Sequence, residues 1–387
     1  MNGAPSEDRP PSGPLSERGL RIVICLSQFH PTIGGAERQL LQLAGRWAAW
    51  GHSVRVFTRP VHGAPRRETL QQVQIHRTIY TLPLGPLFGV SLVTCLVAGL
   101  LRRALRCDVV MAAQAPWEAV ATGIFRRITG APSAVRLANA GPYGDLRQLQ
   151  HAKGRRILTW LVKSNRVFLA LSDQAREELV QFGCPEAKIR QVTNGVDTRY
   201  FVPPEAPDEQ RDHTVLFVAR LSAQKDPLSL LRAWQHVRTD RGYRLLIAGA
   251  GPLAPRIEQT IAELKLKNVE LLGLCRDLLP VYHRAGVFVL PSLSEGCSNA
   301  LLEAMAAGLC PVVTNIGGNR DVITDGVNGR TVQPRDDRQL GAVLGALLAD
   351  PARRNRLAAA ARAHVVAHHD LDVVARQYLA AMTGRPP

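Results

Sequence analysis

Apolar positions along the chain form short continuous runs separated by longer stretches in which they recur at helical spacing. This alternation predicts an α/β protein with parallel sheets, because strands covered on both faces are apolar throughout. The first half has five such runs, at residues 21–27, 53–58, 108–113, 132–137 and 167–172, and the segment KIRQV (188–192) closes it. After the first run, Leu40, Leu43 and Trp47 fall on one face of a helix that Gly51 is expected to end.

The second half repeats this scheme. Its apolar runs lie at residues 214–221, 243–251, 269–274, 287–292 and 309–314. Helices are expected at residues 227–238, 255–264 and 279–284, and beyond residue 338 the chain is expected to be helical to its end. Three prolines and a cluster of charges interrupt the pattern in VPPEAPDEQRDH, residues 202–213, which predicts a linker between two domains. A chain of 387 residues is long enough for two cores.

The expected organisation has five parts. These are a leader (1–18), an N-terminal domain (19–201), the linker (202–213), a C-terminal domain (214–369) and a last helix (370–387). The leader is rich in Pro, Ser, Gly and charge and lacks the apolar stretch of a secretory signal, so we expect it to be disordered. The seven cysteines are scattered and never spaced C-x-x-C, which predicts neither a disulfide framework nor a zinc site. This usage fits a reducing cytoplasm.

Positive charge is concentrated in the first half. The net charge is +16, and 26 Lys and Arg residues stand against 13 Asp and Glu residues in residues 1–200, but 22 against 19 in residues 201–387. One interpretation is a face for anionic lipid or nucleic acid. The other is a solvated, arginine-coated surface, because only six of the 48 basic residues are lysine.

Candidate chemistry is clearest in residues 285–319, where Glu295 and Glu303 are the two formally charged side chains. The run predicts strand, loop, helix, strand and, at NIGG (315–318), a second loop. Both glutamates therefore follow the carboxyl end of a buried strand, where open α/β sheets bind ligands. Burying an unpaired carboxylate is costly, which favours a ligand over a helix-surface position for Glu303. A carboxylate often accepts hydrogen bonds from the vicinal hydroxyls of a ribose or hexose. Ser298 and Asn299 stand at the helix start, where backbone amides can bind an anion.

Glycine pairs mark two further loops after strands. Gly34 and Gly35 precede the first helix, so backbone amides and the positive end of the helix are predicted to face a ligand. Gly249 and Gly251 follow a strand of the second half, where glycines would let the chain approach a ligand closely. The alternative for both pairs is an ordinary glycine-rich turn.

Two cations follow the first strand of the second half. Arg220 and Lys225 lie five residues apart in ARLSAQKD. Arginine can grip a diphosphate as a fork and lysine as a point charge. The alternative is ordinary surface charge.

Six motifs together resemble the retaining glycosyltransferases of family 4, from about Arg21 to the C-terminus. They are GGAER (34–38), TNGVD (193–197), ARLSAQKD (219–226), GAGP (249–252), PSLSEGCSNALLEAMAAGLCPVV (291–313) and GGNRDVI (317–323). The resemblance implies the GT-B fold, in which two Rossmann-like, doubly wound parallel-sheet domains face a cleft. It also implies that the last helix packs back on the N-terminal domain.

The resemblance further implies roles by position. Arg220 and Lys225 would hold the diphosphate of a nucleotide-sugar donor, Glu303 its ribose hydroxyls and Glu295 its sugar. Gly35 would present its amide from the other domain. No metal ion or other cofactor is expected, because the two cations and a helix dipole would take the place of a divalent ion.

Two positions depart from the family pattern. Relatives carry a histidine in the N-terminal domain after the strand equivalent to residues 132–137, whereas this chain reads LANAGPYGDL there. Either Asn139 or a nearby backbone group is expected to serve instead, or this branch of the family uses no side chain at that position. Asp321 stands where relatives often have glutamate.

An uncharged segment followed by arginines bears on the identity of the acceptor. Residues 82–101 carry no charge and are followed by Arg102, Arg103 and Arg106. Two prolines and three glycines argue against a spanning helix, which leaves a buried helix of the first sheet or an interfacial helix on an anionic leaflet. The interfacial interpretation implies a peripheral protein on the inner face of the membrane, with a lipid-linked or envelope acceptor.

The predicted function is therefore retaining transfer of a hexose from a nucleotide diphosphate sugar to a lipid-linked or envelope polysaccharide acceptor. The block EGCSNALLEAM resembles polysaccharide-assembly members, which suggests a UDP-sugar. One alternative is a GT-B nucleotide-sugar epimerase, which needs no acceptor. The other is a basic nucleic-acid-binding protein without enzymatic activity. Against it, the arginines are diffuse and form no recognised module, so no nucleic-acid partner is expected.

Overall fold

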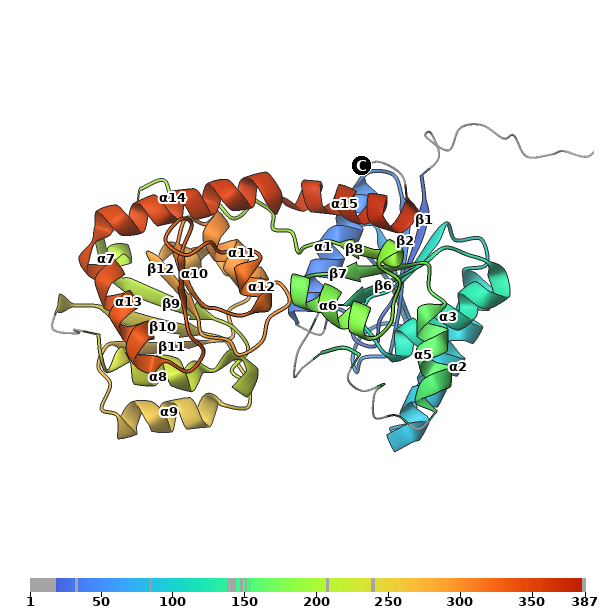
Figure 1. Cartoon of the computed structure of the whole chain (residues 1–387), viewed down its shortest axis with the longest axis horizontal. Coiled ribbons are helices and arrows are strands. Elements are labelled where there is room, and N and C mark those ends of the chain that lie inside the picture. Colours follow the sequence, from blue (N-terminus) through green and yellow to red (C-terminus); the bar gives the residue numbers. More distant parts are fainter. Residues whose placement is uncertain are drawn as a thin grey trace, which may run out of the picture.

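The computed structural model describes residues 19–384 except 32–33, 84, 138, 140–143, 147–148, 150–151, 153, 207–208 and 238–240. The expected leader, residues 1–18, lies outside the described residues. Two α/β domains lie side by side, and the last two helices run along both of them (Figure 1). The two doubly wound parallel-sheet domains predicted from the sequence are confirmed.

The N-terminal sheet has eight strands within the described residues, in the order β3-β4-β2-β1-β5-β6-β7-β8. They are β1 (Arg21–Cys25), β2 (Ser53–Thr58), β3 (Arg67–Leu70), β4 (Val73–Arg77), β5 (Val109–Ala112), β6 (Ser133–Leu137), β7 (Val167–Ala170) and β8 (Ile189–Gln191). Neighbouring strands are parallel except β3 and β4, an antiparallel pair that the apolar pattern did not predict. The edge strand β3 has no fully buried residue, so its sequence carries little apolar signal.

Helices of this domain connect the strands. They are α1 (Gly35–Ala49), α2 (Gly85–Arg103), α3 (Trp117–Thr129), α5 (Arg155–Lys163), α6 (Asp173–Gln181) and the 3-10 turn η2 (Glu186–Lys188). Ser172 caps α6 by accepting a hydrogen bond from the Ala175 amide at 3.1 Å, and Gly183 follows the helix with a positive φ of 81°. Both features are those expected of a helix in this position.

The C-terminal sheet has six parallel strands within the described residues, in the order β11-β10-β9-β12-β13-β14. They are β9 (Thr214–Val218), β10 (Arg244–Ala248), β11 (Val269–Gly273), β12 (Val287–Leu290), β13 (Cys310–Thr314) and β14 (Arg330–Val332). The edge strand β11 is largely exposed, unlike the strands buried on both faces that the sequence predicted throughout this half. Its position at the sheet edge, with one neighbour only, explains the difference.

Helices of the second half are more numerous. They are α7 (Glu209–Asp212), η3 (Ala223–Lys225), α8 (Pro227–Trp234), α9 (Ala254–Glu263), α10 (Leu279–His283), α11 (Asn299–Ala306), α12 (Gly317–Arg320), α13 (Asp337–Ala349), α14 (Pro351–His368) and α15 (Leu371–Thr383). The short α7 lies inside the expected linker. It is held on the C-terminal domain by the buried Arg211, which donates to the carbonyls of Ala285 and Gly308 at 2.9 and 2.8 Å.

Strand order reverses beside β1 in the first sheet and beside β9 in the second. The loops after β1 and β5, and those after β9 and β12, therefore separate at these two points. Open α/β sheets bind their ligands in such crevices, at the carboxyl ends of the strands. The predicted glycine, cation and glutamate loops all follow one of these four strands or the adjacent β10.

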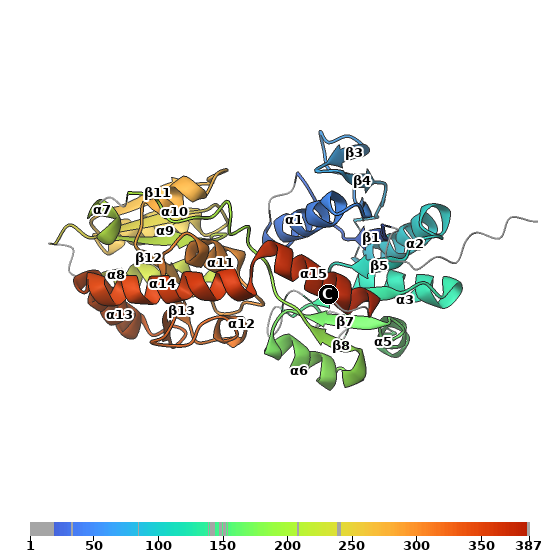
Figure 2. The ribbon, with the colours of Figure 1, turned by 90° about the horizontal axis from the view of Figure 1, so that it is seen from above.

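The last helix returns to the first domain. Figure 2 shows α15 lying over that domain, near α1 and β7. The Trp47 indole donates to the Ala375 carbonyl at 3.0 Å, and Val196 exchanges backbone hydrogen bonds with His369 and Leu371 on either side of the α14–α15 junction. These contacts fix α15 to the N-terminal domain while α14 packs on the C-terminal domain.

Candidate active site

Hydrogen bonds join the loops after β9 and β12 of the C-terminal domain to one another. The Gln224 carbonyl accepts from the Leu293 amide at 2.8 Å, and the Gln224 side chain donates to the Ser294 carbonyl at 3.0 Å. The Lys225 ammonium donates to Glu295 Oε1 at 2.5 Å, although the Glu295 side chain is only 6% exposed. An ion pair offsets the cost of burying this carboxylate, so Glu295 is a buried charge with a partner.

Arg220 is exposed on the same loop, and two glycines hold this loop in place. A Cβ at Gly249 would lie 1.9 Å from the Ala219 carbonyl oxygen, and one at Gly251 would lie 2.4 Å from that of Leu221. Both glycines thus allow the loop after β10 to pack against the Arg220 loop. Close packing of two protein segments explains their small size, and direct contact with a ligand stays a prediction.

A third glycine supports the loop of Glu295 from the other side. A Cβ at Gly318 would lie 1.9 Å from the Gly296 carbonyl oxygen, and the Gly318 amide donates to the Glu295 carbonyl at 3.3 Å. Gly318 belongs to the short helix α12, in a segment where the sequence suggested a loop. The GGNRDVI motif therefore shapes the backbone that presents Glu295.

Glu303 lies inside α11, whose start is capped by Ser298 through a 3.4 Å hydrogen bond from the Leu301 amide. The Glu303 carboxylate is buried, as the sequence indicated, and it has two partners. The Tyr282 hydroxyl donates to Oε2 at 2.9 Å, and Arg38 Nη1 of the other domain lies 3.4 Å from Oε1. Sequence reasoning identified neither Tyr282 nor Arg38 as a site residue, although Arg38 belongs to the GGAER motif.

The starts of α1 and α11 face each other across the domain boundary. Gly34 precedes α1, and the Asn299 side chain at the start of α11 donates to the Gly35 carbonyl at 2.8 Å. A Cβ at Gly35 would meet only this Asn299 nitrogen, at 3.8 Å, among the described residues. Two helix N-termini thus meet at one place, and their dipoles favour negative charge there. At α1 the Glu37 carboxylate already supplies such a charge, because it accepts a hydrogen bond from its own backbone amide.

A buried polar network lies behind this meeting point. The Asn194 side chain donates to Asn299 Oδ1 at 2.7 Å and to the Cys297 carbonyl at 2.8 Å. Arg136, 1% exposed on β6, donates to Asn194 Oδ1 at 2.8 Å and to the Tyr378 hydroxyl of α15 at 3.0 Å. The network connects α15 with the start of α11. Asn194 lies in the TNGVD motif, but nothing in the sequence around Arg136 marks it.

The two residues that depart from the family pattern, Asn139 and Asp321, make hydrogen bonds of different kinds, one within a domain and one between the domains. Asn139, expected to replace a histidine, donates its side-chain amide to Asp145 at 3.2 Å, inside the N-terminal domain. Within the described residues, Asn139 is not joined to the glutamates or cations of the other domain. Asp321 accepts a hydrogen bond from the Asp173 amide at 3.0 Å and so links α12 to α6 across the boundary.

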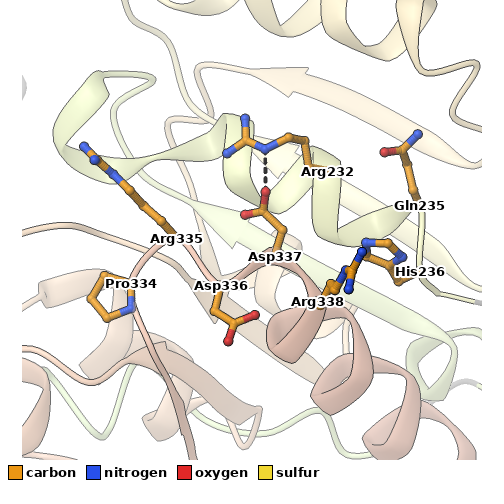
Figure 3. A pocket seen from close by; sticks show the side chains of 8 residues that line it. All are labelled: Arg232, Gln235, His236, Pro334, Arg335, Asp336, Asp337 and Arg338. Carbon is orange, nitrogen blue, oxygen red and sulfur yellow. Dashed lines mark hydrogen bonds and ion pairs between the residues drawn. The ribbon is translucent and has the colours of Figure 1, made fainter.

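A separate pocket opens on the C-terminal domain between α8 and the start of α13. Figure 3 shows Arg232 and Asp337 pointing toward one another within it, joined by an ion pair. None of the residues predicted for the site lines this pocket. The candidate active site therefore rests on the residues at the domain boundary.

Several other properties concern the described part of the chain as a whole. All seven cysteines are free thiols. No three or more His, Cys, Asp or Glu side chains of the described residues are grouped so that they could hold a metal ion. An apolar helix long enough to cross a membrane does not occur in this part of the chain.

Comparison with known families agrees with this geometry. Residues 212–350 match the family described as glycosyl transferases group 1, and residues 33–200 match glycosyltransferase family 4. The chain is 30% identical over 374 residues to a D-inositol 3-phosphate glycosyltransferase of Xylanimonas cellulosilytica, with 85% of this chain and 87% of the relative covered. The chain belongs to the family 4 glycosyltransferases. This membership contradicts the hypothesis of a nucleic-acid-binding protein without enzymatic activity.

Other relatives of this glycosyltransferase extend over nearly its whole length. A glycogen synthase of Mycobacterium tuberculosis is 28% identical over 403 residues, with 94% of this chain and 96% of the relative covered. The crystal structure of Anabaena HepE in complex with UDP-glucose has a TM-score of 0.78 at 18% identity and covers 94% of this chain and 100% of that one. The crystal structure of WaaG, a glycosyltransferase involved in lipopolysaccharide biosynthesis, has a TM-score of 0.73 at 18% identity and covers 94% of this chain and 100% of that one. These likenesses confirm the GT-B fold.

Gly318→Ala tests how the Glu295 loop is held. The new methyl group would overlap the Gly296 carbonyl, so we expect a loss of about 1–3 kcal/mol in the free energy of unfolding and lower transferase activity. The matched control is Gly345→Ala in α13, where a Cβ meets no atom within 4 Å and stability should rise by up to about 1 kcal/mol. Thermal unfolding of both variants checks this, and equal melting temperatures would contradict it.

Proposed function

We propose that the enzyme transfers a hexose from a UDP-sugar to a lipid-linked or envelope polysaccharide acceptor, with retention at the anomeric carbon. The observation that carries this proposal is the meeting of two helix N-termini beside two buried carboxylates that each have a cation as partner. The arrangement offers positive potential for a diphosphate and acceptor oxygens for sugar hydroxyls. The HepE structure with UDP-glucose supports the choice of nucleotide.

In this proposal the residues of the site bind different parts of the donor. Arg220 and Lys225 bind the diphosphate from the loop after β9, and the start of α11 adds its dipole. Glu303 accepts hydrogen bonds from the ribose hydroxyls. Glu295, held by Lys225 at 2.5 Å, lies beside the transferred sugar. Gly35 presents its backbone to the phosphate or the sugar from the opposite domain.

The proposed reaction breaks the bond between the anomeric carbon and the diphosphate oxygen. Positive charge develops on the sugar ring and negative charge on the leaving diphosphate, which Arg220 and Lys225 stabilise. The acceptor hydroxyl attacks from the face that the diphosphate leaves, and its proton passes to a diphosphate oxygen. The bond that forms therefore has the configuration of the one that breaks. The two cations supply the charge neutralisation that a divalent ion provides elsewhere, so the proposal includes no metal ion.

The uncharged segment of residues 82–101 contributes most of α2. One face of α2 is buried in the N-terminal domain through Leu92, Leu96 and Leu100, as a helix covering the first sheet would be. Another face exposes Leu87 and Val90, which are 48% and 61% exposed. The helix thus has both a buried face and an exposed apolar one.

The neighbouring helices α3 and α5 also expose large apolar side chains. Ile128 at the end of α3 is 60% exposed, and Ile157 and Trp160 of α5 are 67% and 51% exposed. The Arg127 guanidinium carbon lies 3.9 Å from the centroid of the Trp160 ring and joins the two helices. We define Arg127, Ile128, Ile157 and Trp160 as the α3–α5 patch. Aromatic and aliphatic groups edged by arginine suit the interface of a membrane.

The charge around the α3–α5 patch has one sign. Helices α2, α3 and α5 carry the basic residues Arg102, Arg103, Arg126, Arg127, Arg155, Arg156 and Lys163. Their single acidic residue, Glu118, is 3% exposed. An anionic leaflet would attract such a surface, which supports a lipid-linked acceptor and peripheral attachment to the inner face of the membrane.

Nucleotide binding is the first test of the proposed function. UDP or a UDP-hexose at 100 times its Kd is expected to add ~2.7 kcal/mol to the free energy of unfolding, and ADP and GDP less. Thermal shift measures the ranking, and NMR of the product should show the anomeric configuration of the donor. Flat responses to all nucleotides, or an inverted product, would contradict the proposal.

Arg220→Ala and Lys225→Ala test the role of the two cations. Each is expected to lower kcat by roughly 10²-fold or more, the size of effect seen when an electrostatic stabiliser of the transition state is removed. Steady-state kinetics with the donor found above measures this. The matched controls Arg241→Ala and Lys267→Ala remove exposed charges of the same domain and should leave kcat unchanged. Unchanged turnover in both test variants would exclude the assignment.

The double variant Ile157→Ser/Trp160→Ser tests the α3–α5 patch. Wild-type protein is expected to sediment with anionic liposomes at low salt and to be released at high salt. Loss of two large apolar side chains should weaken binding by about tenfold or more. The control Leu274→Ser/Val327→Ser removes apolar side chains that are 58% and 60% exposed on the other domain and should bind like wild type. Absence of wild-type binding at low salt would refute membrane attachment.

A further inference from the structure

One ion pair of the site joins the two domains. Arg38 stands in the first turn of α1, three residues after Gly35, and its Nη1 lies 3.4 Å from Glu303 Oε1. The Arg38 side chain is 38% exposed, whereas that of Glu303 is 6% exposed. The Arg38 guanidinium also lies 5.9 Å from the centroid of the Phe201 ring. The pair can exist only while α1 and α11 are close together.

We propose that Arg38 is a positioning residue for the donor: from the opposite domain it orients the Glu303 carboxylate and supplies its counter-charge, so the ribose site is complete only when the domains meet. This inference rests on the proposed function, in which Glu303 accepts hydrogen bonds from the ribose hydroxyls. Arg38 acts through Glu303, and the reacting atoms lie elsewhere.

The Glu303 carboxylate can contact Arg38 and Tyr282 and still accept hydrogen bonds from the ribose. Oε1 faces Arg38 and Oε2 accepts from the Tyr282 hydroxyl at 2.9 Å. An ionised carboxylate has about four acceptor positions on its two oxygens. Two therefore stay open for a pair of vicinal hydroxyls, which a ribose presents. A protonated carboxyl would lose part of this capacity and become a donor itself.

Electrostatics explains why Glu303 needs Arg38. Burial raises the pKa of Glu303, while the positive charge of Arg38 and the hydrogen bond from Tyr282 oppose this rise. In turn, burial and the Glu303 carboxylate raise the pKa of Tyr282 well above its ordinary value, so its hydroxyl stays a donor. Without Arg38, the neutral hydroxyl would be the remaining group that lowers the pKa of Glu303.

Tyr200 and Asp277 are further titratable groups near the Arg38–Glu303 pair. Tyr200 donates to Asp277 at 2.6 Å, and this hydrogen bond raises the pKa of Tyr200; Arg38 and Glu303 affect it less. On the remaining side of α11, Arg362 of α14 donates to the Ala306 carbonyl. Asp277 is a second anion near Arg38: the hydrogen bond from Tyr200 is the main cause that lowers the pKa of Asp277, and the charge of Arg38 adds to it. The test must therefore show that Arg38 acts through Glu303.

The experiment measures UDP affinity of the full chain by calorimetry. Arg38→Met is expected to weaken UDP binding by about tenfold at neutral pH, and Arg38→Lys should restore most of it, because the charge is kept. In a Glu303→Gln background, Arg38→Met should have little further effect. A uridine diphosphate that lacks both ribose hydroxyls should bind equally to wild type and Arg38→Met.

The pH dependence gives an independent readout. Glu303 accepts ribose hydroxyls as a carboxylate, so affinity is present above its pKa and is lost as the pH falls through it. Because Arg38→Met raises this pKa further, the loss should begin at higher pH than in wild type, in a series from about pH 8.5 to about pH 5.5. Arg46→Met, on the same helix, removes ion pairs with Asp197 and Asp372 and should leave the pH profile unchanged.

The outcomes distinguish a failure of the proposed function from a failure of the role of Arg38. Absence of UDP binding in wild type would mean that the proposed function is wrong, and the role of Arg38 with it. If Glu303→Gln weakens UDP binding and Arg38→Met does not, the proposed function stands and the role of Arg38 is overturned. Tighter binding by Arg38→Met would also overturn it, since Arg38 would then compete with the nucleotide.

Discussion

The burial of two carboxylates at the domain boundary is the constraint on which the site depends. Glu295 and Glu303 are almost fully buried, and each needs a positive partner to stay ionised at modest cost. Glu295 takes Lys225 from the neighbouring loop of its own domain, whereas Glu303 takes Arg38 from the other domain. The first pair therefore belongs to the fold of one domain, and the second belongs to the arrangement of both.

Contacts both at the domain boundary and on α15, away from the boundary, hold the two domains in this arrangement. The hydrogen bond from Asn299 to the Gly35 carbonyl continues through Asn194 and the buried Arg136 to Tyr378 of α15. Since α15 is held on the N-terminal domain while α14 packs on the C-terminal one, a shift between the domains must disturb either this network or the α14–α15 junction. The last helix thus takes part in setting the distance between Arg38 and Glu303.

The sequence predicted much of this because the relevant signals are local. Apolar runs revealed most strands, and an uncharged segment drew attention to Glu295 and Glu303. The antiparallel β3–β4 pair was missed because its edge strand has few apolar residues. Arg38 went unassigned for a different reason: nothing in one sequence states which residue of another domain an arginine will meet. The glycines at 249 and 251 were predicted to let the chain approach a ligand, and in the structure they pack against carbonyl groups of the protein.

Lys225 has a divided role in the proposed reaction. In the structure its charge is engaged by Glu295, so the exposed Arg220 and the start of α11 are more available to an incoming diphosphate. As negative charge grows on the leaving diphosphate, Lys225 gains a stronger partner and its attraction to Glu295 weakens. Glu295 then becomes freer to interact with the positively charged sugar beside it. The Lys225–Glu295 ion pair offsets the cost of burying Glu295 in the resting enzyme. In the proposed reaction it would weaken as the transition state forms, which would leave the Glu295 carboxylate to stabilise the positive charge on the sugar.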